Sequence, residues 1–148
     1  MRNRLIKNLD YKERKWLYKA VFHMIMADKT VAREEMDDLM ESLKRVAGKD
    51  IKDFKEVTRY PEFLERLKPL RGISYDHAFI ILIEIVRVAA IDSRIVLEEE
   101  ELLKELLKLL DFDEKAIDKV MIWARQLASI NEEEKHLKEE LVAHYLHL

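Results

Sequence analysis

Only two glycines and two prolines occur among the 148 residues of this sequence. These residue types form most tight turns, so the chain has little material for hairpins or long irregular loops. Apolar side chains recur at helical spacing, and no pair of alternating strand-like segments is present. The apolar fraction of 49% is too high for a disordered chain. We therefore expect an all-α fold of seven or eight helices in a single compact domain over residues 1–148.

Capping residues mark the predicted helix boundaries in the first part of the chain. Asp10 and Glu13 have the spacing of a capping box, in which each side chain accepts a hydrogen bond from the other residue's backbone N–H. The apolar helix that follows should end near Asp28 and lie at the centre of the fold. A second helix is predicted over Ala32–Ala47, and Gly48 has the position of a C-terminal cap.

The remaining boundaries follow from the same signals. Asp50, Pro61, Ser74, Asp113 and Asn131 each stand where a helix is expected to begin. The predicted elements are a short helix from Asp50 to before Pro61, another from Pro61, a loop at Lys68–Gly72, and helices Tyr75–Ile91, Leu97–Leu110, Asp113–Leu127 and Asn131–Leu148. Tyr75–Ile91 is rich in β-branched residues, but its length exceeds that of a usual strand and favours a helix.

A shift of 64 residues aligns two segments of the sequence, Tyr18–Arg45 and Leu82–Leu109. Seven of the 28 aligned positions are identical: Asp28/Asp92, Glu34/Glu98, Glu35/Glu99, Leu39/Leu103, Glu41/Glu105, Leu43/Leu107 and Lys44/Lys108. In each segment an apolar helix ends at an Asp, a short turn follows, and paired Glu residues open the next helix. We expect two helical hairpins, about 11–48 and 74–111, packed around a pseudo-twofold axis, with C-terminal helices over 113–148.

The motif Ala27-Asp28-x-x-Val31-x-x-x-Glu35, repeated as Ile91-Asp92-x-x-Ile95-x-x-x-Glu99, resembles the TerB-like (tellurite-resistance protein B) domain family. This family is related to the N-terminal region of DjlA-type co-chaperones. The resemblance covers roughly residues 11–127 and implies a compact helical fold with a pseudo-repeat. It also implies a non-enzymatic role in stress responses, with acidic turns that bind a divalent cation. The glycine that usually follows the family Asp is replaced here by Lys29 and Ser93.

Four carboxylates form the candidate metal site: Asp28, Glu35, Asp92 and Glu99. Hard divalent cations prefer several oxygen ligands, so a pseudo-twofold that joins both turns predicts a site for calcium, magnesium or manganese, with zinc as a further candidate. The alternative is structural. Acidic side chains in the first turn of a helix are favoured by the helix dipole, by about 0.3–1 kcal/mol each. Both interpretations stay open at this stage.

Other charged residues suggest weaker candidate sites. Glu84 lies one turn from Arg87 on the most apolar helix, so we expect the two to pair with each other or to reach solvent. His136, Glu140, His144 and His147 share one face of the last helix, a pattern that can bind zinc or nickel but is more typical of a solvated helix. His23 is expected to be a hydrogen-bonded residue of the central helix. No motif of a known catalytic class is present, so we predict that the protein is not an enzyme.

Charge and composition limit the expected partners and location. The net charge of −3 argues against nucleic-acid binding, and the absence of cysteine fits a reducing compartment. No secretory signal or membrane-spanning stretch is recognised, so a cytoplasmic protein is expected. The first 20 residues carry seven basic and two acidic side chains, which would suit peripheral contact with an anionic membrane. Protein partners are the main expectation, and a helical adaptor with purely structural acidic turns is the alternative function. Oligomeric state is not predicted.

Overall fold

Helices form the whole framework of the computed structural model, which describes residues 6–27, 33–91, 95 and 97–146, with only the backbone at 33–35. The long helices are α2 (Tyr11–Ala27), α3 (Arg33–Ala47), α5 (Tyr75–Ile91), α6 (Leu97–Leu109) and α7 (Glu114–Leu146). Between α3 and α5 lie the 3-10 helix η1 (Gly48–Asp50), helix α4 (Ile51–Val57) and the 3-10 helix η2 (Pro61–Leu64). The described residues contain no strand, so the all-α prediction is confirmed for them.

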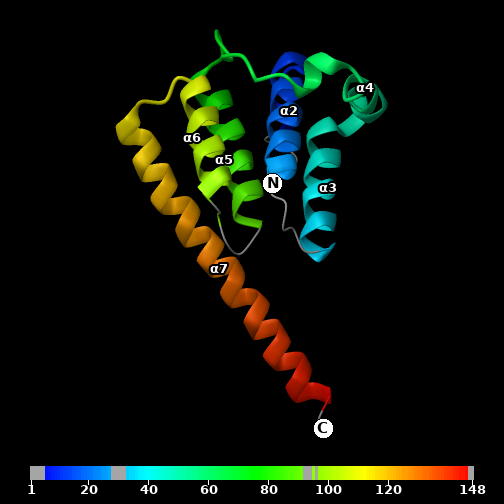
Figure 1. Cartoon of the computed structure of the whole chain (residues 1–148), viewed down its shortest axis with the longest axis vertical. Helices are drawn as coiled ribbons and strands as arrows, with labels where there is room; N and C mark the ends of the chain where they lie inside the picture. The colour runs from blue at the N-terminus through cyan, green and yellow to red at the C-terminus, as the bar shows by residue number, and fades with distance from the viewer. Residues whose placement is uncertain (1–5, 28–32, 92–94, 96, 147–148) are drawn as a thin grey trace.

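Helices α2 and α5 lie at the centre of the bundle (Figure 1). Helix α2 packs against α3, α5 and α6. Helix α5 packs against α2, α3, α6 and α7. Nine of the 17 residues of α5 are buried, which explains why its sequence is apolar on most sides. The buried side chains of all these helices join in one hydrophobic cluster.

Local capping positions the starts of the helices as the sequence predicts. The backbone N–H of Asp10 donates to Glu13 Oε1 at 2.9 Å, and the N–H of Glu13 donates to Asp10 Oδ1 at 2.8 Å, which completes the capping box. Ser74 Oγ accepts from the N–H of His77 at 3.2 Å, and Asp113 caps α7 in the same way. Gly48 follows α3 with a φ of 54°, as expected for a C-terminal cap.

The segment between α4 and α5 crosses one face of α2 and is held there by side chains of that helix. Trp16 Nε1 donates to the carbonyl of Lys68 at 2.8 Å, and Lys19 Nζ donates to that of Glu62 at 3.0 Å. The ring of His23 contacts the carbonyl oxygen of Phe63 at 2.9 Å, so the expected hydrogen bond of His23 is confirmed. These three residues are one turn apart, which places them on a single helix face.

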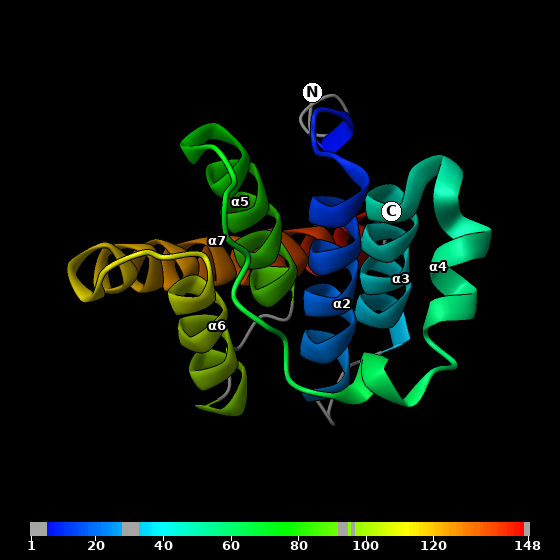
Figure 2. The same cartoon turned by 90° about the horizontal axis from the view of Figure 1, so that it is seen from above.

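Helix α7 is continuous over 33 residues, so the predicted break at Asn131 is wrong. The side chain of Asn131 does not cap a new helix. Its Nδ2 donates to the carbonyl of Ala90 at 2.8 Å, one of the carbonyls left without a helical partner at the end of α5. Beyond this point α7 extends past the other helices, as Figure 1 shows, and in the view from above it runs behind α5 and α2 toward α3 (Figure 2). Within the described residues, no helix combines the length and apolarity needed to cross a membrane.

Candidate functional site

The structure describes only part of the predicted acidic corner. Asp28 and Asp92 lie outside the described residues, and of Glu35 only the backbone, in the first turn of α3, is described. Glu99 lies in the first turn of α6 with 3% of its surface exposed, so its carboxylate is in the interior. Among the described side chains, no three metal-binding residues come together. The four-carboxylate site therefore stays a prediction.

The predicted partner of Glu84 is wrong. Glu84 is 2% exposed, and its Oε1 lies 2.5 Å from Nη2 of Arg45 on α3. The same Nη2 is 3.2 Å from Ser42 Oγ on its own helix, so the guanidinium joins α3 to α5 through Glu84 and is also held by a residue of α3. The cation that compensates Glu84 comes from 39 residues away, and not from Arg87, its neighbour on the same helix. The charge of Glu84 therefore forms an interhelical ion pair.

The predicted histidine site on the last helix does not form among the described residues. His136 is 65% exposed and lies 3.7 Å from carboxylates of both Glu132 and Glu139, which are neighbours on its own helix. His147 lies outside the described residues, and no metal-binding cluster includes His144. This face of α7 is solvated.

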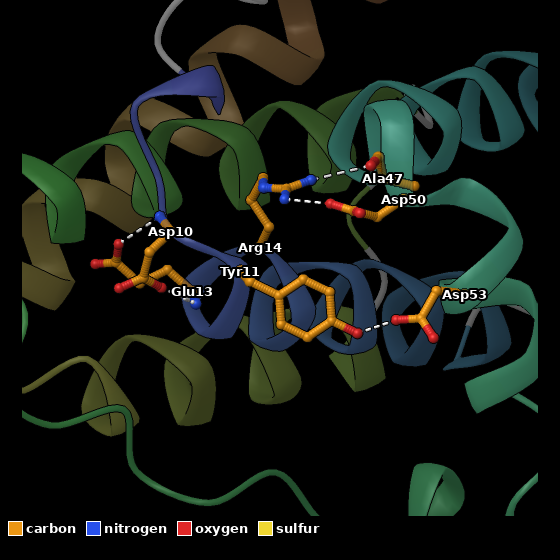
Figure 3. A network of polar contacts seen from close by, with 7 residues as sticks. All are labelled: Asp10, Tyr11, Glu13, Arg14, Ala47, Asp50 and Asp53. Carbon is orange, nitrogen blue, oxygen red and sulfur yellow. Dashed lines mark hydrogen bonds and ion pairs between the residues drawn. The ribbon is translucent and has the colours of Figure 1, made fainter.

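A polar network fastens the first turns of α2 to the segment after α3 (Figure 3). Arg14 donates to the carbonyl of Ala47 at 3.0 Å and forms an ion pair with Asp50. Tyr11 donates a hydrogen bond to the carboxylate of Asp53, and this bond raises the pKa of Tyr11 above its ordinary value. Each group in this network has a protein partner, so its evident role is to hold α2 against η1 and α4.

A second buried polar contact lies between the starts of α2 and α5. Glu13 is 2% exposed, and its two carboxylate oxygens lie 2.9 and 3.0 Å from Nδ1 of His77. Glu13 also accepts the backbone N–H of Asp10, so two groups contact this one carboxylate. The arrangement satisfies a buried charge and joins the two central helices.

The most distinctive surface is the part of α7 that extends beyond the bundle. We call residues 133–146 the α7 overhang, because every one of them is exposed. Four large apolar side chains within it are 55–77% exposed: Leu137, Leu141, Tyr145 and Leu146. An apolar side chain left in water at this exposure forgoes most of its burial free energy, about 25 cal/mol per Å².

A groove of about 940 Å³ lies between the overhang and the bundle. Its bundle side is formed by Asp38 of α3 and by Arg87 and Ile91 of α5, and its other side by the overhang. Arg87, expected to pair with Glu84, therefore lines this groove. The groove is open, apolar along the helix, and bordered by charges of both signs.

Sequence reasoning found the leucines of the last helix but not their exposure. Residues 131–140, NEEEKHLKEE, contain a single apolar side chain. A helix that packs on its own bundle usually has an apolar stripe of three to four residues per two turns, and this stretch falls well below that. The small number of apolar residues in this stretch is the sequence feature that indicates a helix outside the core.

No family model, curated protein or solved structure matches this chain.

Proposed function

We propose that this protein is a non-enzymatic interaction module whose binding surface is the α7 overhang and the groove beside it. The observation that carries the proposal is the exposure of Leu137, Leu141 and Tyr145, at 55%, 59% and 77%, on one helix that extends beyond the bundle. Clustered exposed apolar residues with a polar border are typical of protein–protein interfaces.

The form of this surface favours another protein as its ligand. The apolar side chains recur at i, i+4 and i+8, the pattern by which an amphipathic helix presents anchors to a partner. The helix is already formed and continuous with the bundle, so binding does not require it to be ordered first. A small molecule would gain less from an elongated, open surface than from an enclosed pocket.

We further propose that the fold is a TerB-like pseudo-repeat, as the motif at Asp28 and Asp92 implies. Three observations support a 64-residue repeat. Helices α2 and α5 begin at Tyr11 and Tyr75, which are 64 positions apart. The caps Asp10 and Ser74 are also 64 apart. Glu13 and His77, again 64 apart, contact each other, as equivalent residues do on a twofold axis.

Divalent cation binding at Asp28, Glu35, Asp92 and Glu99 is the second proposed function, within a stress-response role of the TerB-like type. The burial of Glu99 in the first turn of α6 supports it, because a carboxylate directed to the interior suits a ligand more than a solvated cap does. An ion that binds only the folded state stabilises it and so raises the melting temperature. When the free ion concentration is 100 times its Kd, the unfolding free energy rises by about 2.7 kcal/mol.

Melting curves with calcium, magnesium, manganese, zinc or a chelator test the cation proposal. We expect a rise with ion in the wild type and none in the Asp28→Asn, Asp92→Asn double variant. Asn retains the side-chain oxygen that caps a helix, so the variant should melt like the wild type in chelator. A wild-type curve that no ion moves would exclude the site.

The interaction proposal is tested by comparing the proteins retained by three full-length baits. These are the wild type, Leu137→Lys with Leu141→Lys, and Ile122→Lys, whose side chain is 56% exposed on the part of α7 that packs on the bundle. We expect partners retained by the wild type and by Ile122→Lys to be lost from the double variant. An identical set of retained proteins for all three baits would contradict the proposed surface.

A further inference from the structure

We infer that the α7 overhang pairs antiparallel with the same segment of a second copy of this chain. The inference rests on the proposed interaction surface and names its partner. It follows from the order of side chains along one stripe of α7, which we call the seam: Ile130, Glu134, Leu137, Leu141 and His144.

The seam has the spacing of a two-stranded coiled coil. Its members are separated by four, three, four and three residues, the alternation of core positions in a heptad repeat. All five are exposed, and the apolar members Ile130, Leu137 and Leu141 are 57%, 55% and 59% exposed. A stripe of this periodicity buries its apolar side chains when a second helix lies along it.

Complementarity between a carboxylate and an imidazole N–H that can donate to it selects an antiparallel partner. Suppose that Leu137 of one chain faces Leu141 of the other. The two helices run in opposite directions, so three residues before Leu137 on the first chain correspond to three residues after Leu141 on the second. Glu134 therefore faces His144. The pairing then contains two Leu–Leu layers and two Glu–His layers. A parallel pairing in register would place Glu134 against Glu134 and His144 against His144 in the same core.

The side chains that border the seam do not reverse this preference. Antiparallel pairing brings Lys138 of one chain near Lys138 of the other, and Glu140 near Glu140. Both are contacts between like charges. Lys138 and Glu140 are exposed positions outside the seam, where charges interact by less than about 1 kcal/mol and are screened by salt. Like charges within the core layer are desolvated and cost more.

The bundle of the same chain leaves the seam exposed, and three of its residues, Glu134, Leu137 and Leu141, line the open groove beside the bundle. The stripe of α7 buried against the bundle consists of Ile117, Met121, Ala124 and Ala128. The buried positions are spaced alternately by four and three residues, so the next position of that stripe is residue 131. Residue 131 is one residue from Ile130 of the seam. The two stripes are therefore about 100° apart around the helix axis. A partner helix can lie along the seam without displacing the bundle.

The length of the overlap and the shape of the molecule fit the same arrangement. Residues 130–146 span about 25 Å of helix. In an antiparallel overlap of this length the two bundles lie at opposite ends of the paired segment. Helix α7 extends beyond its own bundle, as Figure 1 shows, which leaves length on this helix for a partner helix to lie along. Because each helix is already held by its bundle, pairing avoids the cost of helix nucleation.

Disulfide cross-linking of the full chain tests the orientation, since the sequence contains no cysteine. We expect an equimolar mixture of Glu134→Cys and His144→Cys chains to form a covalent dimer rapidly under mild oxidation. Each variant alone should cross-link slowly, because position 134 would lie about 15 Å along the helix from its own copy, beyond disulfide reach. Rapid cross-linking of Glu134→Cys alone would overturn the antiparallel pairing.

Sedimentation of the unlabelled proteins at rising concentration tests association itself. We expect the wild type and Ile122→Lys to reach twice the mass of one chain. We expect Leu137→Lys with Leu141→Lys to weaken self-association by at least about 100-fold, because it removes both Leu–Leu layers. A wild type that stays monomeric at high micromolar concentration would overturn the inference. The interaction proposal would still stand if the three baits retained different sets of proteins. If all three baits retained the same proteins, both proposals would be wrong.

Discussion

Glu84 and Glu13 show how this protein accommodates carboxylates in its interior. Each is 2% exposed, and each contacts a nitrogen atom of a side chain from another helix, Arg45 and His77 respectively. The sequence could not identify these partners. Rules based on helix spacing detect residues three or four positions apart, whereas these pairs are separated by 39 and 64 residues.

Replacing Glu84 with Leu should destabilise the protein by about 3 kcal/mol, because it leaves the guanidinium of Arg45 partly buried without its carboxylate. The double variant Arg45→Met, Glu84→Leu should recover most of that loss, since paired apolar side chains of similar size need no compensation. Urea denaturation measures both. As a control, Glu41→Gln removes the exposed ion pair with Lys44 and should cost less than about 1 kcal/mol. Equal losses in the single and double variants would contradict a coupled pair.

Tyr11 should ionise at a pH above the ordinary tyrosine pKa of about 10, because its hydroxyl donates to the Asp53 carboxylate. The contribution of this bond to stability is present below pH 10 and is lost as the pH rises through the pKa of folded Tyr11. The absorbance of ionised tyrosine is titrated against pH in the wild type and in Tyr11→Phe. The difference between the two curves gives the ionisation of Tyr11 alone. Asp53→Asn should move the midpoint of Tyr11 back toward 10. A Tyr11 midpoint below 10 would contradict the hydrogen bond.

At the scale of elements, most helix boundaries could be predicted because their signals are local. Asp10, Ser74 and Asp113 cap the helices that they precede, and Gly48 ends α3. Asn131 was the exception. Its capping-box spacing is genuine, but its side chain reaches a carbonyl of α5, and a local pattern contains no information about an acceptor on another helix.

The end of α6 offers a stabilising substitution. Asp111 has a φ of 69°, the N–H of Phe112 bonds the carbonyl of Leu107, and the N–H of Asp111 bonds that of Lys108. This is a Schellman motif with Asp at the position that favours glycine. Asp111→Gly should therefore raise the unfolding free energy by about 1 kcal/mol. Asp111→Ala, which retains a Cβ and loses the polar side chain, should be less stable than wild type. Chemical denaturation decides, and a destabilised Asp111→Gly would refute the assignment.

At the scale of the whole molecule, the core could be predicted and the position of the last helix could not. Leu39, Leu43, Leu103 and Leu107 occupy matched positions of the two aligned segments, and all four are buried in one cluster. The leucines of the overhang have the same periodicity but remain exposed. Periodicity predicts which face of a helix is apolar. Whether that face meets its own chain depends on helix lengths and crossing directions, which no short segment encodes.

A shared core has a measurable consequence for the two hairpins. Leu43 on α3 and Leu107 on α6 are 4% and 0% exposed. Leu43→Ala and Leu107→Ala should each cost about 2–5 kcal/mol, from lost burial and the cavity left behind. Leu137→Ala on the overhang is the matched control and should change the stability of the monomer by less than about 0.5 kcal/mol. Unfolding curves followed by tryptophan fluorescence measure all three, and a loss below about 1 kcal/mol in either hairpin would contradict a common core.

The hydrogen bond between Asn131 and Ala90 makes α7 a lever with a defined fulcrum. On one side of the fulcrum the helix is fixed to α5 and α6. On the other, 15 residues extend about 22 Å, so a bend of about 10° at Asn131 moves the tip of the helix by about 4 Å. The fulcrum bears on the last turn of α5, directly before Asp92. A change at that turn that bends α7 at Asn131 would therefore be largest at the tip of the helix, at Tyr145.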